Sequence, residues 1–107
     1  MRVKHAELTK IYQILMDALA DSDIISKDND IDFFYDYYWS ISLGERHNLN
    51  SQPELDIGSI AHDLERIRQC ISDNDPVSEQ FRWLGNVLIA IADTFNHHIN
   101  QGKSIGL

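Results

Sequence analysis

Two adjacent histidines near the end of the sequence, His97 and His98, are candidates for a metal site. Asp93 and His97 lie four residues apart, so a helix would place a carboxylate and an imidazole on one face, with His98 beside them. A metal site would need a third ligand, and no other histidine stands at a metal-binding spacing; the candidates are His5, His47 and His62. A solvated helix end, where the helix dipole favours imidazolium, explains the same residues, so we expect no metal site.

Alternating acids at Asp28, Asp30 and Asp32 have the spacing of oxygen ligands in a calcium loop. Such a loop requires glycine at its sixth position and a bidentate glutamate at its twelfth. Counted from Asp28, these positions hold Phe33 and Trp39. We therefore expect no calcium site either.

Catalytic motifs are missing from the sequence. It contains no G-x-S-x-G segment, no cysteine and histidine paired by a motif, and no glycine-rich phosphate loop. Cys70 lies beside Ile71 near the end of a predicted helix, where a structural role is the commoner one. We predict a protein that is not an enzyme and needs no cofactor.

The single cysteine also bears on the compartment, because one thiol cannot form an internal disulfide. The N-terminal segment has charges but no apolar stretch after them, and no apolar run is long enough to span a bilayer. These features predict a cytoplasmic protein without membrane contact.

Acidic residues dominate the charge: 17 Asp and Glu stand against 9 Lys and Arg, for a net charge of −8. Such a chain repels nucleic acid and anionic lipid and attracts a positively charged protein. Seven acids and one base fall between residues 17 and 36; the acids are Asp17, Asp21, Asp23, Asp28, Asp30, Asp32 and Asp36. Two interpretations stay open, a solvated loop that keeps a small protein soluble and a docking surface for a basic partner.

Aromatic residues adjoin these acids, with six of the ten in the chain between residues 31 and 41. At least half of them are expected in the core. Tyrosine and tryptophan are also the residues most enriched at binding hot spots, and about two of the four candidates should reach a partner. The candidates are Tyr35, Tyr37, Tyr38 and Trp39.

Apolar residues spaced three and four apart predict three helices. The first covers residues 5–21, and the second carries an apolar stripe over residues 57–71, with Asp56 as its N-cap. The third begins at Asp75 and Pro76. We expect it to end near Asn100 with Gly102 as the breaker, followed by a flexible tail over residues 103–107.

The aromatic stretch 31–41 fits either period, since its odd positions are all apolar and a helical stripe fits equally well. Its residue types favour a strand. No second segment looks like a partner, however, and an unpaired strand would leave backbone groups unsatisfied. We therefore expect a short helix or an irregular segment, in a single all-α domain, 1–107, built as a bundle of three main helices.

Short motifs spread from Asp36 to Ile91 resemble a family of small bacterial immunity proteins of contact-dependent growth inhibition and related polymorphic toxin systems. They are Asp36-Tyr37-Tyr38-Trp39-Ser40-Ile41, Pro53-Glu54-Leu55-Asp56-Ile57-Gly58, Asp63-Leu64-Glu65, Pro76-Val77-Ser78, Trp83-Leu84 and Ile89-Ala90-Ile91. Where the family usually has proline after the first motif, this chain has Ser42-Leu43-Gly44. The resemblance implies a cytosolic protein that blocks one toxin domain, often a nuclease, without catalysis or cofactor.

Charge and resemblance together predict stoichiometric inhibition of a basic toxin C-terminal domain, without direct contact to nucleic acid. Acids would steer and pair with Lys or Arg, and the aromatic residues would anchor. The predicted toxin-binding residues are Asp17, Asp21, Asp28, Asp30, Asp32, Tyr35, Asp36, Tyr37, Tyr38 and Trp39. An acidic helical adaptor that binds another host protein is the alternative, and monomer and homodimer are equally compatible with the sequence.

Overall fold

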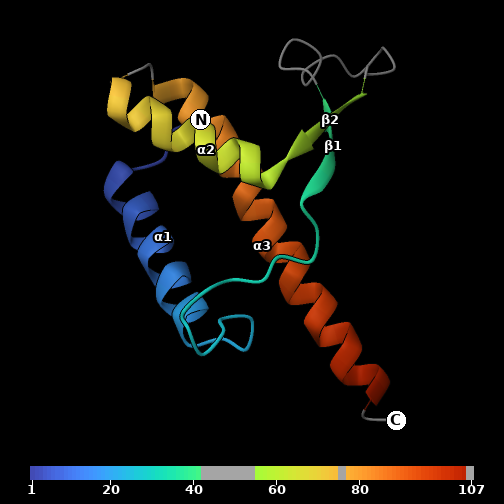
Figure 1. The fold of residues 1–107 in the computed structure, drawn as a ribbon. Helices are drawn as coiled ribbons and strands as arrows, with labels where there is room; N and C mark the ends of the chain where they lie inside the picture. The colour runs from blue at the N-terminus through green and yellow to red at the C-terminus, as the bar shows by residue number, and fades with distance from the viewer. Residues whose placement is uncertain (42–54, 75–76, 106–107) are drawn as a thin grey trace. The chain divides into compact units, whose positions relative to one another are not determined.

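The computed structural model describes residues 1–41, 55–74 and 77–105. These residues form a mostly helical protein with three helices and one antiparallel pair of strands (Figure 1). The elements, in chain order, are α1 (His5–Ala20), β1 (Tyr37–Ile41), β2 (Leu55–Ser59), α2 (Ile60–Asp73) and α3 (Val77–Ile105). None of the helices in the described part of the chain has the length and apolarity needed to cross a membrane.

Contacts divide the chain into two compact units, Met1–Asp32 and Phe33–Leu107. The first unit holds α1 and the loop after it; the second holds both strands, α2 and α3. The predicted single domain, and the packing of the first helix in a three-helix bundle, stay predictions.

The first unit matches the predicted first helix within one residue, because α1 ends at Ala20 and Asp21 follows as its C-cap. After the helix the chain turns back on itself, and Ile25 and Ile31 form an isolated antiparallel bridge. Between them Asn29 takes a positive φ of 65°, a conformation that asparagine tolerates better than most residues.

The aromatic stretch contains a strand, so the all-α prediction was wrong in this part. β1 pairs with β2 in a continuous antiparallel register that runs from Tyr37 opposite Ser59 to Ile41 opposite Leu55. The preceding residues 32–36 have no regular structure, as the irregular alternative expected. The β-favouring residue types therefore identified β1 correctly, and its partner strand was the element that we missed.

The partner strand, β2, overlaps the start of the predicted second helix. Ile57 has helical spacing to Ile60, which extended the apolar stripe of α2 backwards into β2. The helix begins only at Ile60, with Ser59 as its N-cap, and the Ser59 hydroxyl accepts a hydrogen bond from the His62 N–H at 3.3 Å. The predicted cap, Asp56, lies inside β2 instead.

The third helix is longer than predicted. α3 passes through Gly102 and reaches Ile105, so the end near Asn100 was wrong, while Asp75 and Pro76 lie outside the described residues. One glycine costs about 1 kcal/mol in a helix interior, which does not suffice to stop a helix of this length. Of the predicted tail 103–107, the first three residues are helical and the last two are not described.

The core of the second unit lies where α2 packs on α3. Ile60, Val87 and Ala90 are buried there. Partly buried side chains from the irregular segment, β1 and both helices close around them: Phe33, Tyr35, Tyr38, Leu64 and Ile91. The aromatic segment thus supplies three of its side chains to this core.

Gly58 leaves the space that the Tyr38 ring occupies. The two residues are cross-strand partners, and a Cβ built on Gly58 would overlap the ring. Because the Tyr38 hydroxyl is held by Asp63, the ring cannot swing aside without losing that hydrogen bond.

We therefore expect Gly58→Ala to lower the free energy of unfolding by about 1–3 kcal/mol, the usual cost of overpacking. Gly85→Ala is the matched control: Gly85 lies in α3, and apart from its chain neighbours and the backbone of its own helix, no atom of the described residues lies within 4 Å of a built Cβ. This substitution should stabilise the protein by about 0.5–1 kcal/mol. Urea unfolding of the two variants measures both effects. Equal stability in the two would contradict the close contact.

Candidate functional site

The segment before β1 is fixed to α3 by two hydrogen bonds. The Phe34 N–H donates to Oγ1 of Thr94 at 3.0 Å, and the Thr94 hydroxyl, buried at 1% exposure, donates to the Ala90 carbonyl at 2.8 Å. The Tyr35 hydroxyl donates to Oδ2 of Asp93 at 2.5 Å. The Phe34 N–H thus pairs with a side chain on α3, where a residue in a sheet would pair with a neighbouring strand.

Stacking adds a third contact to the same helix. The Phe34 ring lies on the His97 imidazole, with centroids 3.8 Å apart and 17° between the planes, and His98 meets His97 edge-on. His97 thus has a packing role. In the described part of the chain no three His, Cys, Asp or Glu side chains gather as a metal site would require, and His47 lies outside it.

Tyr38 anchors β1 to both helices of the second unit. Its hydroxyl donates to Oδ2 of Asp63 on α2, and Nδ2 of Asn86 on α3 donates to the same oxygen at 3.4 Å. Asp63 is only 5% exposed, so its carboxylate depends on these two donors. Burial, together with the Asp63 carboxylate, raises the pKa of Tyr38 above its ordinary value of 10.

Asp36 joins β1 to the start of α2. Its Oδ1 accepts the Ala61 N–H and the Ser59 hydroxyl, both at 3.0 Å, and its carbonyl accepts the Ile60 N–H at 2.8 Å. The Ile60 and Ala61 N–H groups belong to the first turn of α2 and have no acceptor within the helix. The Ala61 N–H, followed by the Ser59 hydroxyl, holds the pKa of Asp36 below its usual value.

Alternation along β1 sends Tyr37 and Trp39 to the side opposite Tyr38. They are 71% and 70% exposed. On β2, Ile57 lies directly opposite Trp39 and is 67% exposed, and Leu55, two residues before Ile57, is 51% exposed. We call these four side chains the ribbon face. Two of the four aromatic candidates therefore turn outward, while Tyr35 and Tyr38 are used by the fold. That the two outward rings reach a partner stays a prediction.

The ribbon face includes two residues that sequence reasoning missed, Leu55 and Ile57. The signal was present, because β2 alternates apolar side chains with Asp56 and Gly58. The helical spacing of Ile57 to Ile60 concealed it.

The remaining predicted site residues lie in the first unit, and all are exposed: Asp17, Asp21, Asp28, Asp30 and Asp32. Asp17 accepts a hydrogen bond from Nε2 of Gln13 at 2.8 Å. The Asp30 backbone closes a loop with Ser26, whose N–H donates to the Asp30 carbonyl at 2.8 Å. That these acids and the ribbon face bind the same partner stays a prediction.

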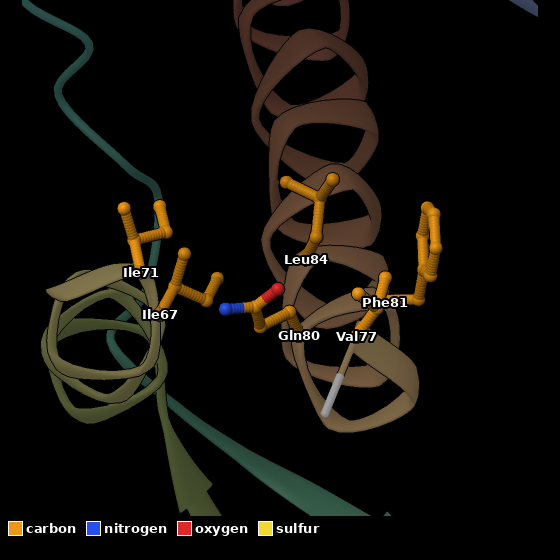
Figure 2. A pocket seen from close by; sticks show the side chains of 6 residues that line it. All are labelled: Ile67, Ile71, Val77, Gln80, Phe81 and Leu84. Atoms are coloured by element: carbon orange, nitrogen blue, oxygen red, sulfur yellow. The ribbon is translucent and has the colours of Figure 1, made fainter. Parts of the chain in front are cut away.

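A second apolar surface lies between α2 and α3. An open hollow there has a volume of about 220 Å³. Figure 2 shows the side chains that line it: Ile67, Ile71, Val77, Gln80, Phe81 and Leu84. Gln80 supplies the one polar side chain among them. None of these six side chains carries a group that could act as an acid, a base or a nucleophile.

The raised pKa values predict a loss of stability in alkali. Burial and the Asp93 carboxylate raise the pKa of Tyr35 to about 12, so the fold favours the protonated phenol. This stabilisation is complete below pH 10, the unfolded pKa, and disappears as the pH rises through the folded value near 12. Denaturant titrations across this range should therefore show stability falling.

The double variant Tyr35→Phe, Tyr38→Phe should be less stable than the parent at pH 8 and should lose less on going to high pH, because neither ring can ionise. Tyr37→Phe, at an exposed position of the same strand, is the control and should follow the parent. A double variant with the same alkaline slope as the parent would contradict this assignment.

The lowered pKa of Asp36 predicts the opposite dependence. The carboxylate stabilises the fold above the unfolded pKa near 4, and this contribution is lost as the pH falls through the lower folded value. Asp36→Asn should therefore melt at a lower temperature than the parent at pH 7, and the difference should shrink toward pH 2. Asp56→Asn, an exposed acid on β2, should leave the melting temperature unchanged at both pH values.

Comparison with known proteins adds nothing to this geometry: the chain matches no protein-family model, no curated protein and no solved structure. Its function is therefore argued from its own residues.

Proposed function

We propose that the chain is an immunity protein that binds a cognate toxin domain one to one and neutralises it, with the ribbon face as the contact surface. The observation that carries this proposal is the exposure of Tyr37 and Trp39, 71% and 70%, on a strand whose intervening tyrosine is anchored inside. Large aromatic side chains that cluster in solvent are the usual anchors of protein interfaces.

The ribbon face is also held in place before any partner arrives. Asp36 fixes one end of β1 to α2, and Tyr38 fixes its middle to Asp63. A surface that is already ordered loses little conformational entropy on binding, which favours tight and slowly dissociating complexes. That property suits an inhibitor that must hold its toxin.

Charge supports a basic partner. The chain carries −8, and five of the predicted contact acids are exposed in the first unit. A toxin that cleaves nucleic acid binds polyanions and is commonly basic around its cleft, so an acidic protein can occupy the same track. Electrostatic attraction would speed capture in the cytoplasm, where such a toxin acts.

The test uses the toxin domain encoded directly upstream, at the C-terminus of the preceding gene product. Expression of the chain should rescue growth of a sensitive cell in which this domain is induced, and the two should copurify one to one. Trp39→Ala and Tyr37→Ala should each weaken the complex about 30-fold or more, as hot-spot truncations do. The triple reversal Asp28→Lys, Asp30→Lys, Asp32→Lys should slow association at low salt.

The control is Phe81→Ala, because Phe81 is 68% exposed in the hollow between α2 and α3. It should leave affinity and rescue unchanged. If Phe81→Ala abolishes binding and Trp39→Ala does not, the ribbon face is the wrong surface. If the parent chain neither rescues growth nor forms a complex, immunity is excluded and the acidic adaptor becomes the better interpretation.

A further inference from the structure

Tyr37 and Trp39 are two exposed rings on one face of one strand. They are two positions apart in β1, so their Cα atoms are separated by about 7 Å and their side chains leave the strand in the same direction. Tyr38, between them, is hydrogen-bonded to Asp63 on α2 and fixes the orientation of the strand. The ribbon face therefore carries two rings whose attachment points have a set separation.

This separation matches the thickness of a planar group with a ring on either side. Atoms in van der Waals contact lie about 3.5–4.0 Å apart, so a flat group between two parallel rings needs about 7–8 Å. The guanidinium of arginine is flat and stacks on aromatic faces, whereas the ammonium of lysine is a compact and strongly hydrated point charge. Of the two basic side chains, arginine is therefore the one that fits between the rings.

Charge favours a cation at this position over a neutral side chain. The chain carries −8 and attracts cations, and the face of an aromatic ring attracts a cation through its quadrupole. None of the four ribbon-face side chains carries a positive charge that would repel one. The fold already contains one contact of this kind, because the Arg66 guanidinium lies 5.6 Å from the centre of the Trp83 ring.

We propose that Tyr37 and Trp39 form a binding site for one arginine side chain, which the partner of the ribbon face supplies. The guanidinium lies between the two rings, and the methylene groups of the arginine extend over Ile57, opposite Trp39. None of the ribbon-face side chains is a carboxylate, so the site selects arginine over lysine by stacking. The inference rests on the proposed function for its partner: on a toxin domain, this arginine belongs to the basic surface.

The site can be tested on the full chain without a toxin. The tripeptides Gly-Arg-Gly, Gly-Lys-Gly and Gly-Leu-Gly, blocked at both ends, are titrated into the protein at about 0.15 M salt, where long-range attraction is screened. The arginine peptide should shift the indole N–H resonance of Trp39 but not that of Trp83, and should bind about three- to fivefold more tightly than the lysine peptide. Nuclear Overhauser contacts should join its δ-methylene protons to both the Tyr37 and Trp39 rings.

Variants separate the rings from the rest of the surface. Tyr37→Leu and Trp39→Leu each remove one ring but keep an apolar side chain, so each should abolish the preference for arginine over lysine. Tyr37→Phe keeps the ring and should keep the preference. Phe81→Leu is the matched control, because Phe81 is a similarly exposed ring on α3, and it should change neither affinity. An unshifted Trp83 resonance shows that a variant is folded.

Three results would overturn the inference. Equal affinity for the arginine and lysine peptides would mean that net charge alone attracts them. Tighter binding of the leucine peptide would mean that the rings take an apolar side chain. A preference for arginine that survives both leucine variants would belong to another surface.

Failure of this inference differs from failure of the proposed function. If the chain rescues growth through Trp39 but shows no preference for the arginine peptide, the immunity function stands and the arginine site is excluded. If the preference is present and depends on both rings but the chain does not rescue growth, the arginine site stands and serves a basic partner other than a toxin.

Discussion

The buried hydrogen bond between Tyr38 and Asp63 is the contact on which the arrangement of the second unit depends. A carboxylate with 5% exposure requires donors, and in the described part of the chain Asp63 accepts from the Tyr38 hydroxyl and, at a longer distance, from Asn86. Once that tyrosine is directed inward over Gly58, the two-residue period of a strand leaves its neighbours no choice. Tyr37 and Trp39 must therefore point outward. The hydrogen bond of Tyr38 to Asp63 thus determines both how β1 is attached to α2 and which side chains form the ribbon face.

The helices could be predicted from sequence because their signal is local. The first helix was found within one residue, and the apolar stripe of α3 was recognised as helical, because residues three and four apart lie on one face. Strand pairing joins segments that are distant in the chain, and no pattern within β1 reveals its partner. The helical spacing of apolar residues continues from α2 back across Ile60, so part of β2 was predicted as the start of the second helix.

Which tyrosines of the aromatic stretch face inward could not be predicted from the sequence either. Alternation predicts that adjacent residues face opposite ways, but it does not say which parity faces inward. That choice depends on Asp63, Asp93 and Gly58, residues that only the folded chain brings to the tyrosines. Asp36 is the converse case: it was predicted as a contact acid, and the structure shows that its carboxylate also caps α2.

Because Trp39 is exposed, its intrinsic fluorescence can report on binding to the ribbon face. The chain has two tryptophans, and the second, Trp83, is half-buried on α3 with the Arg66 guanidinium 5.6 Å from its ring centre. An indole in water emits at longer wavelength and is quenched by small solutes, while a shielded one is less sensitive to both. The fluorescence of Trp39 therefore reports on whatever covers the ribbon, and that of Trp83 on the integrity of the helices, so the two events can be separated without a label.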